Sequence, residues 1–317
     1  MTKNYFRCIL ISALCLFMGL SSCKKFPSQS VPAYIHINSM SVECDYQIYG
    51  AKTSNITDAW VYVDDQIIGC YELPATFPIL EKGPHKVAIY GGIQEGGRGS
   101  ARGPYPFYMP KVYRDLDLVE DSIINLYPVL NYYPIGEGVQ VSWKEDFEMA
   151  NSLLPMPQSD TTIESVSVIE DSHAWTDSLN SYRSGRVSLP PDSLDFYVAS
   201  ADELSFHKDY VSYCLLEMDY NCNDTFFVGL TYLEDYTIYS HPLVKVVPTD
   251  KQHDRPSVWK KMYVNLGPFM NEHVNADYFK VYFTSYLQTG YETYNYHPIS
   301  ENRYYYLDNL KVLYRPR

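Results

Sequence analysis

Residues 58–69 read DAWVYVDDQIIG. Apolar and polar side chains alternate on both sides of Asp64-Asp65, and alternation with a period of two is typical of strands that bury one face. Two acidic residues between two such runs predict the tip of a β-hairpin, where Asp65 adopts the positive φ that glycine usually supplies. The surrounding sequence has no sustained helical period. This stretch therefore predicts an all-β fold.

The same alternation fills the N-terminal part of the chain, over residues 33–134. Further strands are expected at 34–37, 86–89 and 121–126. The glycine-rich stretch 91–103 is expected to be a hairpin loop. It is not expected to bind phosphate, because no Gly-Lys-Ser/Thr follows its glycines. An immunoglobulin-like or transthyretin-like β-sandwich accommodates this pattern.

Turn residues at 133–138 mark a boundary, and short strands recur from residue 139 to residue 317. At least seven strands separated by polar loops favour a jelly roll of two sheets. The expected architecture is therefore two β-sandwich domains, residues 33–134 and 139–317. The strands of the second are predicted at 139–147, 184–189, 211–220, 226–230, 259–266, 278–285 and 304–314.

The C-terminal part resembles the galactose-binding-type jelly rolls, a superfamily that includes many carbohydrate-binding modules. The resemblance is carried by EDFE at 145–148, SGRV at 184–187, LEMDY at 216–220, WKKMYVNL at 259–266 and YLDNLKV at 306–312.

This resemblance implies that the first and last strands lie side by side and hold a structural calcium, here at Glu148 and Asp308. Calcium takes six to eight oxygen ligands, so two carboxylates would supply only part of its shell. A second interpretation stays open, in which the two carboxylates pair with lysine or backbone donors at the sheet edge.

The N-terminus begins with a basic segment containing Lys3 and Arg7, followed by an apolar run over residues 8–20 and then Ser21-Ser22-Cys23. This is the plan of a secretory signal, and the run is too short for a comfortable membrane span. Leu-Ser-Ser-Cys resembles the bacterial lipobox, which implies that Cys23 is lipid-modified and becomes the first residue of the mature protein. The alternative is an ordinary cleaved signal followed by an unrelated cysteine.

A lipobox followed by a sandwich and a jelly roll resembles envelope lipoproteins of Bacteroidota-type bacteria. Residues 1–22 would then be the signal peptide and residues 23–32 a lipid-anchored tether. Lys24-Lys25 after the cysteine lacks the aspartate that retains many lipoproteins at the inner membrane, and lacks an acidic export signal. The resemblance thus implies an outer-membrane lipoprotein that faces the periplasm.

The composition is acidic, with 38 Asp and Glu against 25 Lys and Arg, which argues against nucleic acid as a partner. Cys44 and Cys70 fall in the N-terminal sandwich and could pair if their strands are neighbours. Cys214 and Cys222 lie on one extended run, too far apart for a disulfide, and are expected to be buried thiols.

No sequence motif indicates catalysis. The eight histidines are scattered, and neither HExxH nor GxSxG occurs. The acidic pairs Glu145-Asp146, Glu170-Asp171 and Glu234-Asp235 are adjacent residues, whose side chains point to opposite faces of a strand. We expect a solvated acidic rim, no zinc site and no catalytic residue.

Aromatic side chains in polar loops are the candidate ligand-binding residues. Exposed rings stack on the apolar faces of sugars and also anchor protein interfaces, whereas the alternative is that they cap the sandwich core. The candidates are Trp175 in one loop and four tyrosines in another, Tyr286, Tyr291, Tyr294 and Tyr296.

These observations favour a non-enzymatic, lipid-anchored envelope protein. The leading hypothesis is an accessory subunit of an outer-membrane complex, docking on a barrel or on another lipoprotein. The alternative is a glycan-binding lipoprotein of a polysaccharide-capture system. A glycoside-active hydrolase whose carboxylates meet only in the fold is the weakest interpretation.

Overall fold

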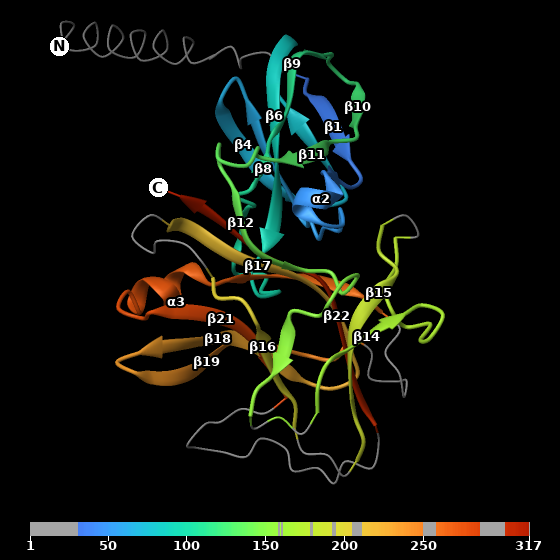
Figure 1. Ribbon diagram of the computed structural model, residues 1–317. Coiled ribbons are helices and arrows are strands. Elements are labelled where there is room, and N and C mark those ends of the chain that lie inside the picture. The colour runs from blue at the N-terminus through green and yellow to red at the C-terminus, as the bar shows by residue number, and fades with distance from the viewer. Residues whose placement is uncertain are drawn as a thin grey trace, which may run out of the picture.

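The computed structural model describes residues 31–157, 159, 161–177, 180–191, 195–204, 211–249, 258–285 and 302–316. Nearly all of its regular structure is β, which confirms the predicted all-β class (Figure 1). Across the described ranges, no helix has the length and apolar character needed to cross a membrane.

The N-terminal elements are β1 (Ala33–Ile37), β2 (Ser41–Glu43), α2 (Tyr46–Tyr49), β3 (Asp58–Val63), β4 (Gln66–Glu72), β5 (Ala75–Ile79), β6 (Gly83–Gln94), β7 (Arg102–Pro104), β8 (Tyr108–Met109), β9 (Lys111–Leu118), β10 (Ile123–Leu126) and β11 (Val129–Tyr132). The C-terminal elements are β12 (Gln140–Glu145), β13 (Leu153–Pro155), β14 (Glu164–Ser167), β15 (Arg183–Leu189), β16 (Tyr197–Ser200), β17 (Val211–Cys222), β18 (Phe226–Glu234), β19 (Thr237–Val246), β20 (Lys260–Asn265), α3 (Gly267–Glu272), β21 (Tyr278–Thr284) and β22 (Arg303–Pro316).

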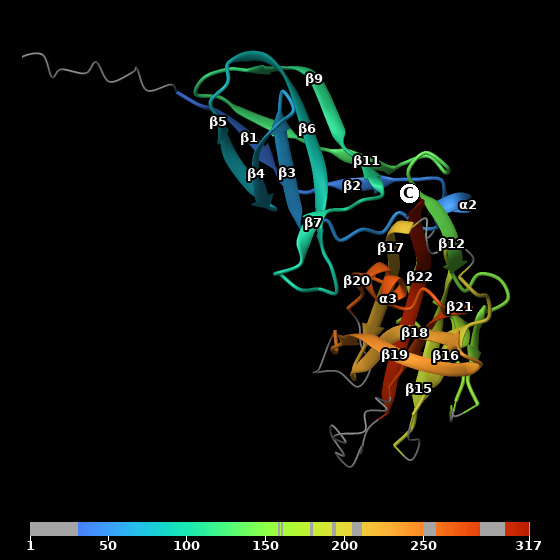
Figure 2. The same ribbon diagram turned by 90° about the vertical axis from the view of Figure 1, so that its left-hand side faces the viewer.

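The N-terminal strands form three sheets, in the orders β10-β1-β5, β2-β11-β8 and β4-β3-β6-β7, with β9 on β6 (Figure 2). We call these elements the N-terminal sandwich. Two pairings are parallel, β1 with β10 and β2 with β11. Alternating buried residues such as Ile35, Val61 and Ile89 form its core. Strand β6 continues through Gly91 to Gln94, so the predicted loop at 91–103 is shortened to the segment between β6 and β7.

The predicted hairpin is present between β3 and β4. Asp64 and Asp65 both have positive φ, 47° and 66°. A two-residue hairpin turn of type I′ requires positive φ at both of its central residues. The Asp64 carboxylate accepts hydrogen bonds from the backbone N–H of Lys86 at 3.1 Å and from Nδ1 of His85 at 2.6 Å. These bonds to the neighbouring strand explain how a non-glycine residue is held in the left-handed region.

The C-terminal strands form two sheets that enclose a second apolar core, and we call them the jelly roll. One sheet has six strands in the order β14-β15-β22-β17-β20, with β12 also paired to β22. The other has five, in the order β13-β16-β21-β18-β19. We call them the front sheet and the back sheet. Cys214 and Cys222 are buried free thiols, as predicted, and Cys44 and Cys70 are also free.

One end of the front sheet is covered by the N-terminal sandwich (Figure 1). The inner face of β17 faces the jelly-roll core through residues such as Leu216 and Met218, so the intervening side chains point outward. Three residues on the outer face of the front sheet belong to the apolar cluster of the N-terminal sandwich: Leu215, Tyr263 and Leu313. The two sandwiches therefore share buried apolar contacts.

A buried charged group lies in the same junction. Glu217 is fully buried on β17 and forms ion pairs with Lys261 at 3.0 Å and Lys311 at 3.5 Å. It also accepts hydrogen bonds from the hydroxyl groups of Tyr105 and Tyr132, both from the N-terminal sandwich. We call these five residues the junction cluster.

Candidate functional site

Beyond the junction, the outer face of the front sheet carries polar and aromatic side chains in a row across the strands. Arg186 on β15 is paired with Tyr306 on β22, which is paired with Asn221 on β17. Trp259 immediately precedes β20, whose Lys260 is paired with the residue before Asn221. The row spans about 14 Å, because neighbouring strands are about 4.8 Å apart.

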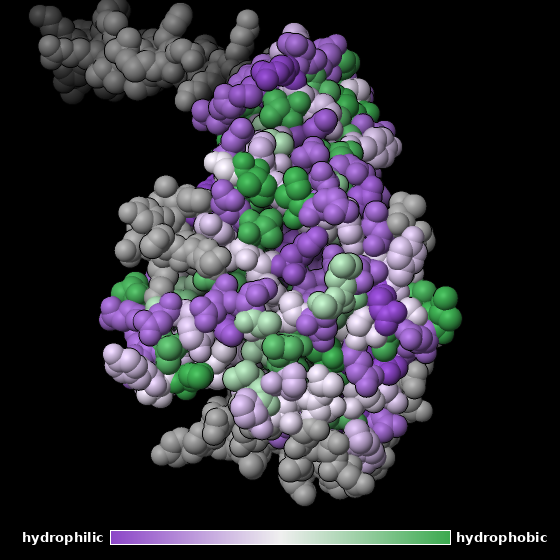
Figure 3. Space-filling view, in the orientation of Figure 1, coloured by the Kyte–Doolittle hydropathy of each residue, from purple (hydrophilic) through white to green (hydrophobic). Residues whose placement is uncertain are grey.

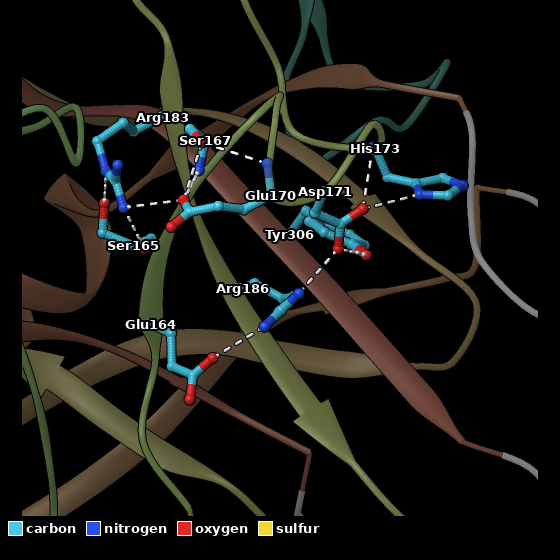
Figure 4. A network of polar contacts seen from close by, with 9 residues as sticks. All are labelled: Glu164, Ser165, Ser167, Glu170, Asp171, His173, Arg183, Arg186 and Tyr306. Atoms are coloured by element: carbon cyan, nitrogen blue, oxygen red, sulfur yellow. Dashed lines mark hydrogen bonds and ion pairs between the residues drawn. The ribbon is translucent and has the colours of Figure 1, made fainter.

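Asp171 is the centre of the hydrogen-bond network at this row (Figure 4). Its side chain is buried and accepts from the Tyr306 hydroxyl at 2.8 Å, from Nη1 of Arg186 at 3.0 Å and from Nδ1 of His173 at 2.9 Å. Burial raises the pKa of Asp171, but these hydrogen bonds outweigh burial and lower the pKa to about 2. The carboxylate is therefore ionised at neutral pH and fixes three side chains from separate segments.

A second network lies beside the first and ties residues 165–170, at the end of β14, to Arg183 on β15. Glu170 accepts from the backbone N–H of Ser167 at 2.7 Å and from Nη2 of Arg183 at 3.3 Å (Figure 4). Arg183 also donates to the backbone oxygen of Ser165 at 2.6 Å. Since Glu170 is tied to both strands, the position of the adjacent Asp171 is determined.

The accessible members of the site are two rings and a guanidinium. The side chain of His173 is 25% exposed and that of Arg186 is 23% exposed, whereas Tyr306 is fully buried beneath them. The half-buried Trp259 donates from its indole nitrogen to the backbone oxygen of His173 at 2.9 Å. The rings of His173 and Trp259 lie 6.2 and 6.3 Å from that of Tyr306, centroid to centroid.

This arrangement offers groups that can bind a ligand. Its guanidinium, imidazole and carboxylate groups offer directed donors and acceptors, and its rings offer flat apolar faces. The Asp171–His173 pair could orient a general base, but no hydroxyl of the described residues hydrogen-bonds to the other ring nitrogen of His173. The buried Asp171 and Tyr306 support the side chains that can reach a ligand.

Of the aromatic residues predicted from sequence, Trp175 lies close to this site. Its backbone N–H donates to the hydroxyl of Ser184 at 2.8 Å, two residues from Arg186 on β15, and its side chain is half-buried. Tyr286, Tyr291, Tyr294 and Tyr296 lie outside the described residues, and so does Cys23. Their predicted roles stay predictions.

The structure brings Glu148 and Asp308, the predicted calcium ligands, into one region. Oε1 of Glu148 accepts from the backbone N–H groups of Tyr182 and Arg183 at 2.6 and 2.7 Å. Asp308 accepts from Ser184 and from its neighbouring backbone amide. Burial raises the pKa of Asp308, and the charges of Asp219 and Glu148 raise it further.

Protein donors thus occupy Oε1 of Glu148 and both oxygens of Asp308. Over the described ranges, no three His, Cys, Asp or Glu residues are grouped so as to hold a metal ion. The calcium site stays a prediction.

Sequence reasoning missed Asp171, His173, Arg186, Trp259 and Tyr306 as a group. The prediction of a solvated rim at Glu170-Asp171 is wrong for Asp171, whose side chain is buried, although the two side chains do enter separate networks. One local signal was available, because Asp171-Ser-His173 is a spacing at which an aspartate caps the backbone amide two residues later. The cross-strand row could not be found without the register.

Comparisons with known proteins give fold likenesses only. No family model matches the chain. No curated protein matches it either. Among solved structures, the CBM22-2 xylan-binding domain of Xyn10C from Paenibacillus barcinonensis is 13% identical with a TM-score of 0.36, covering 54% of this chain and 97% of that one.

The tandem CBM22-1–CBM22-2 domain of the same protein is 12% identical with a TM-score of 0.36, covering 91% of this chain and 75% of that one. A family 30 carbohydrate-binding module from Clostridium thermocellum is 11% identical with a TM-score of 0.31, covering 54% and 91%. All three are carbohydrate-binding modules, and at this level of similarity they do not indicate what this chain binds.

Proposed function

We propose that this is a non-enzymatic, lipid-anchored envelope protein that binds glycan on the outer face of its front sheet. The observation that carries the proposal is the cross-strand row, in which an ionised buried carboxylate holds a guanidinium and an imidazole beside an indole. The lipid anchor is proposed from the lipobox-like sequence that ends at Cys23.

Recognition of a sugar uses both kinds of group found at this site, polar groups and aromatic rings. Their hydroxyl groups both donate and accept, and the guanidinium of Arg186 and the carboxylate of Glu164, joined at 3.0 Å, provide both functions at one edge. Their ring faces carry apolar C–H groups that pack on aromatic rings, here Trp259 and His173. A row about 14 Å long can contact more than one sugar ring, which favours a polysaccharide over a monosaccharide.

We expect Trp259→Ala to weaken glycan binding by about tenfold, because an aromatic contact contributes about 1 kcal/mol or more. Affinity electrophoresis of the full chain in native gels containing xylan, β-glucan or mucin glycans measures this. Tyr236→Ala is the matched control, since Tyr236 is 99% exposed and lies in the turn between β18 and β19, two strands of the back sheet.

Two results would contradict the proposal. One is that none of these glycans retards the native protein, and the other is that Trp259→Ala is retarded as strongly as the native protein. Tyr306→Phe separates contact from positioning, because it removes only the hydroxyl that holds Asp171. We expect a smaller loss of affinity for Tyr306→Phe than for Trp259→Ala.

A second candidate function, docking on an outer-membrane complex, is favoured by the hairpin of β18 and β19. Tyr236, Ile238 and Tyr239 at its tip are 99%, 58% and 45% exposed. On the face shown in Figure 3, however, hydrophobic residues lie in small separate groups. A stoichiometric membrane partner that co-purifies from gently solubilised envelopes, and is lost on Tyr236→Ala, would favour this function.

A further inference from the structure

Four exposed apolar side chains surround the point where the chain enters the N-terminal sandwich. Val31, Leu80, Val119 and Ile123 are 45%, 61%, 51% and 63% exposed. Strand pairing places them together: Ala33 is opposite Ile79, the residue before Leu80, and Tyr34 is opposite Ile123. We call these four residues the entry end.

Backbone hydrogen bonds close this end of the sandwich. The N–H of Asp121 donates to the oxygen of Pro32 at 3.0 Å, and the N–H of Ser122 donates to the oxygen of Val119 at 3.3 Å. The described chain starts at the extremity of the sandwich remote from the jelly roll (Figure 2). The entry end is therefore a fixed surface opposite to the candidate glycan site.

The length of the tether limits how far this surface can be from a membrane. Val31 is eight residues from Cys23, and eight fully extended residues span at most about 29 Å. The charged residues around the entry end are Glu81, Glu120, Asp121 and Lys82, and Lys82 is ion-paired with Glu120. This rim is net negative, but Lys24 and Lys25 beside Cys23 balance it, so the charges next to the lipid nearly cancel and favour a zwitterionic surface over an anionic one.

We propose that the entry end rests in the headgroup layer of the bilayer that holds the lipid at Cys23, so that the jelly roll points away from the membrane. The apolar side chains enter the interface, while the rim charges stay in water. This inference rests on the lipid anchor proposed above, and it adds an orientation that a flexible tether alone would not impose.

The test uses the full-length lipoprotein in phosphatidylcholine vesicles, with a fluorescent NBD label on Ile123→Cys in a Cys70→Ser background. Cys70→Ser removes the exposed native thiol. Tyr127→Cys is the matched control, because Tyr127 is 75% exposed just past the far end of β10, about 13 Å along the strand. We expect doxyl-labelled lipid to quench the label at 123 several-fold more strongly than the label at 127.

Each contrary result identifies a different error. If the protein floats with the vesicles but both labels are quenched equally weakly, the orientation is wrong and glycan binding is unaffected. If the protein does not float, the lipid anchor is wrong and this proposal falls with it. The glycan assay distinguishes both results from failure of the candidate site, since it needs no membrane.

Discussion

Replacing Glu217 by glutamine is expected to lower the free energy of unfolding by about 3–5 kcal/mol, the cost typical of removing one partner from a buried ion pair. Glutamine preserves the shape of the side chain but removes its charge. Lys311 is 1% exposed and, with glutamine at 217, loses this anionic partner and keeps neutral acceptors such as the backbone oxygen of Tyr49, at 2.6 Å. An ammonium group in that position is poorly compensated.

A double variant separates the charge from the packing. Glu217→Gln combined with Lys311→Met removes both charges of the pair, while the amide oxygen of glutamine can still accept from the hydroxyl groups of Tyr105 and Tyr132. We expect this double variant to be clearly more stable than Glu217→Gln. Urea unfolding at neutral pH, followed by tryptophan fluorescence, measures all three proteins.

The exposed pair of Lys52 and Glu43 provides the matched control. Both side chains are 56% exposed, so Glu43→Gln should change stability by no more than about 1 kcal/mol. If Glu217→Gln is as mild as Glu43→Gln, then the junction cluster does not hold the two sandwiches together. We also expect a single unfolding transition, because the sandwiches share apolar contacts through Leu215 and Tyr263.

The same carboxylate makes stability depend on pH. Burial raises the pKa of Glu217, but Lys311, Lys261 and the Tyr105 hydroxyl outweigh burial and lower the pKa to about 2, from an ordinary 4.5. Its stabilising contribution is therefore fully present above pH 4.5 and is lost as the pH falls toward 2. The difference in stability between the native protein and Glu217→Gln should shrink over this interval, and an unchanged difference would contradict the depressed pKa.

The alternation of residue types predicted strands well, but it could not show what covers them. In LEMDY at 216–220, Glu217 and Asp219 alternate with apolar residues, a pattern typical of a strand with one solvated face. Both acids are instead buried, because the N-terminal sandwich and lysines from two other strands cover them. Sequence periodicity identifies the outward face of a strand, whereas contacts with distant segments determine its exposure.

The pairing register of the strands is the other determinant of the site that could not be predicted from sequence. The pattern correctly predicted a strand at 304–314. Tyr306 belongs to the cross-strand row, however, because it is paired with Asn221, 85 positions earlier in the chain. A shift of one residue would place Tyr306 in the core and Tyr305 on the outer face. By contrast, the hairpin at Asp64-Asp65 was predictable because its determinants are adjacent in sequence.

Gly229→Ala is expected to lower the free energy of unfolding by about 2–4 kcal/mol, at the upper end of what overpacking usually costs. Gly229 lies on β18, between β21 and the edge strand β19 of the back sheet, at an irregularity in its pairing with β19. An added Cβ would be 2.1 Å from the backbone oxygen of His241 and 2.8 Å from the ring of Tyr282. Since the first of these atoms belongs to a paired strand, no side-chain rotation can relieve the clash.

Gly103→Ala is the matched control, because a Cβ at Gly103 would meet no atom within 4 Å. We expect it to change stability by no more than about 0.5 kcal/mol. Equal stability of the two variants in urea would show that β18 and β19 do not approach as closely as Gly229 implies. The proposed glycan site lies on the front sheet, so folded Gly229→Ala should still bind glycan, whereas Trp259→Ala should bind glycan about tenfold more weakly without losing stability to the same extent.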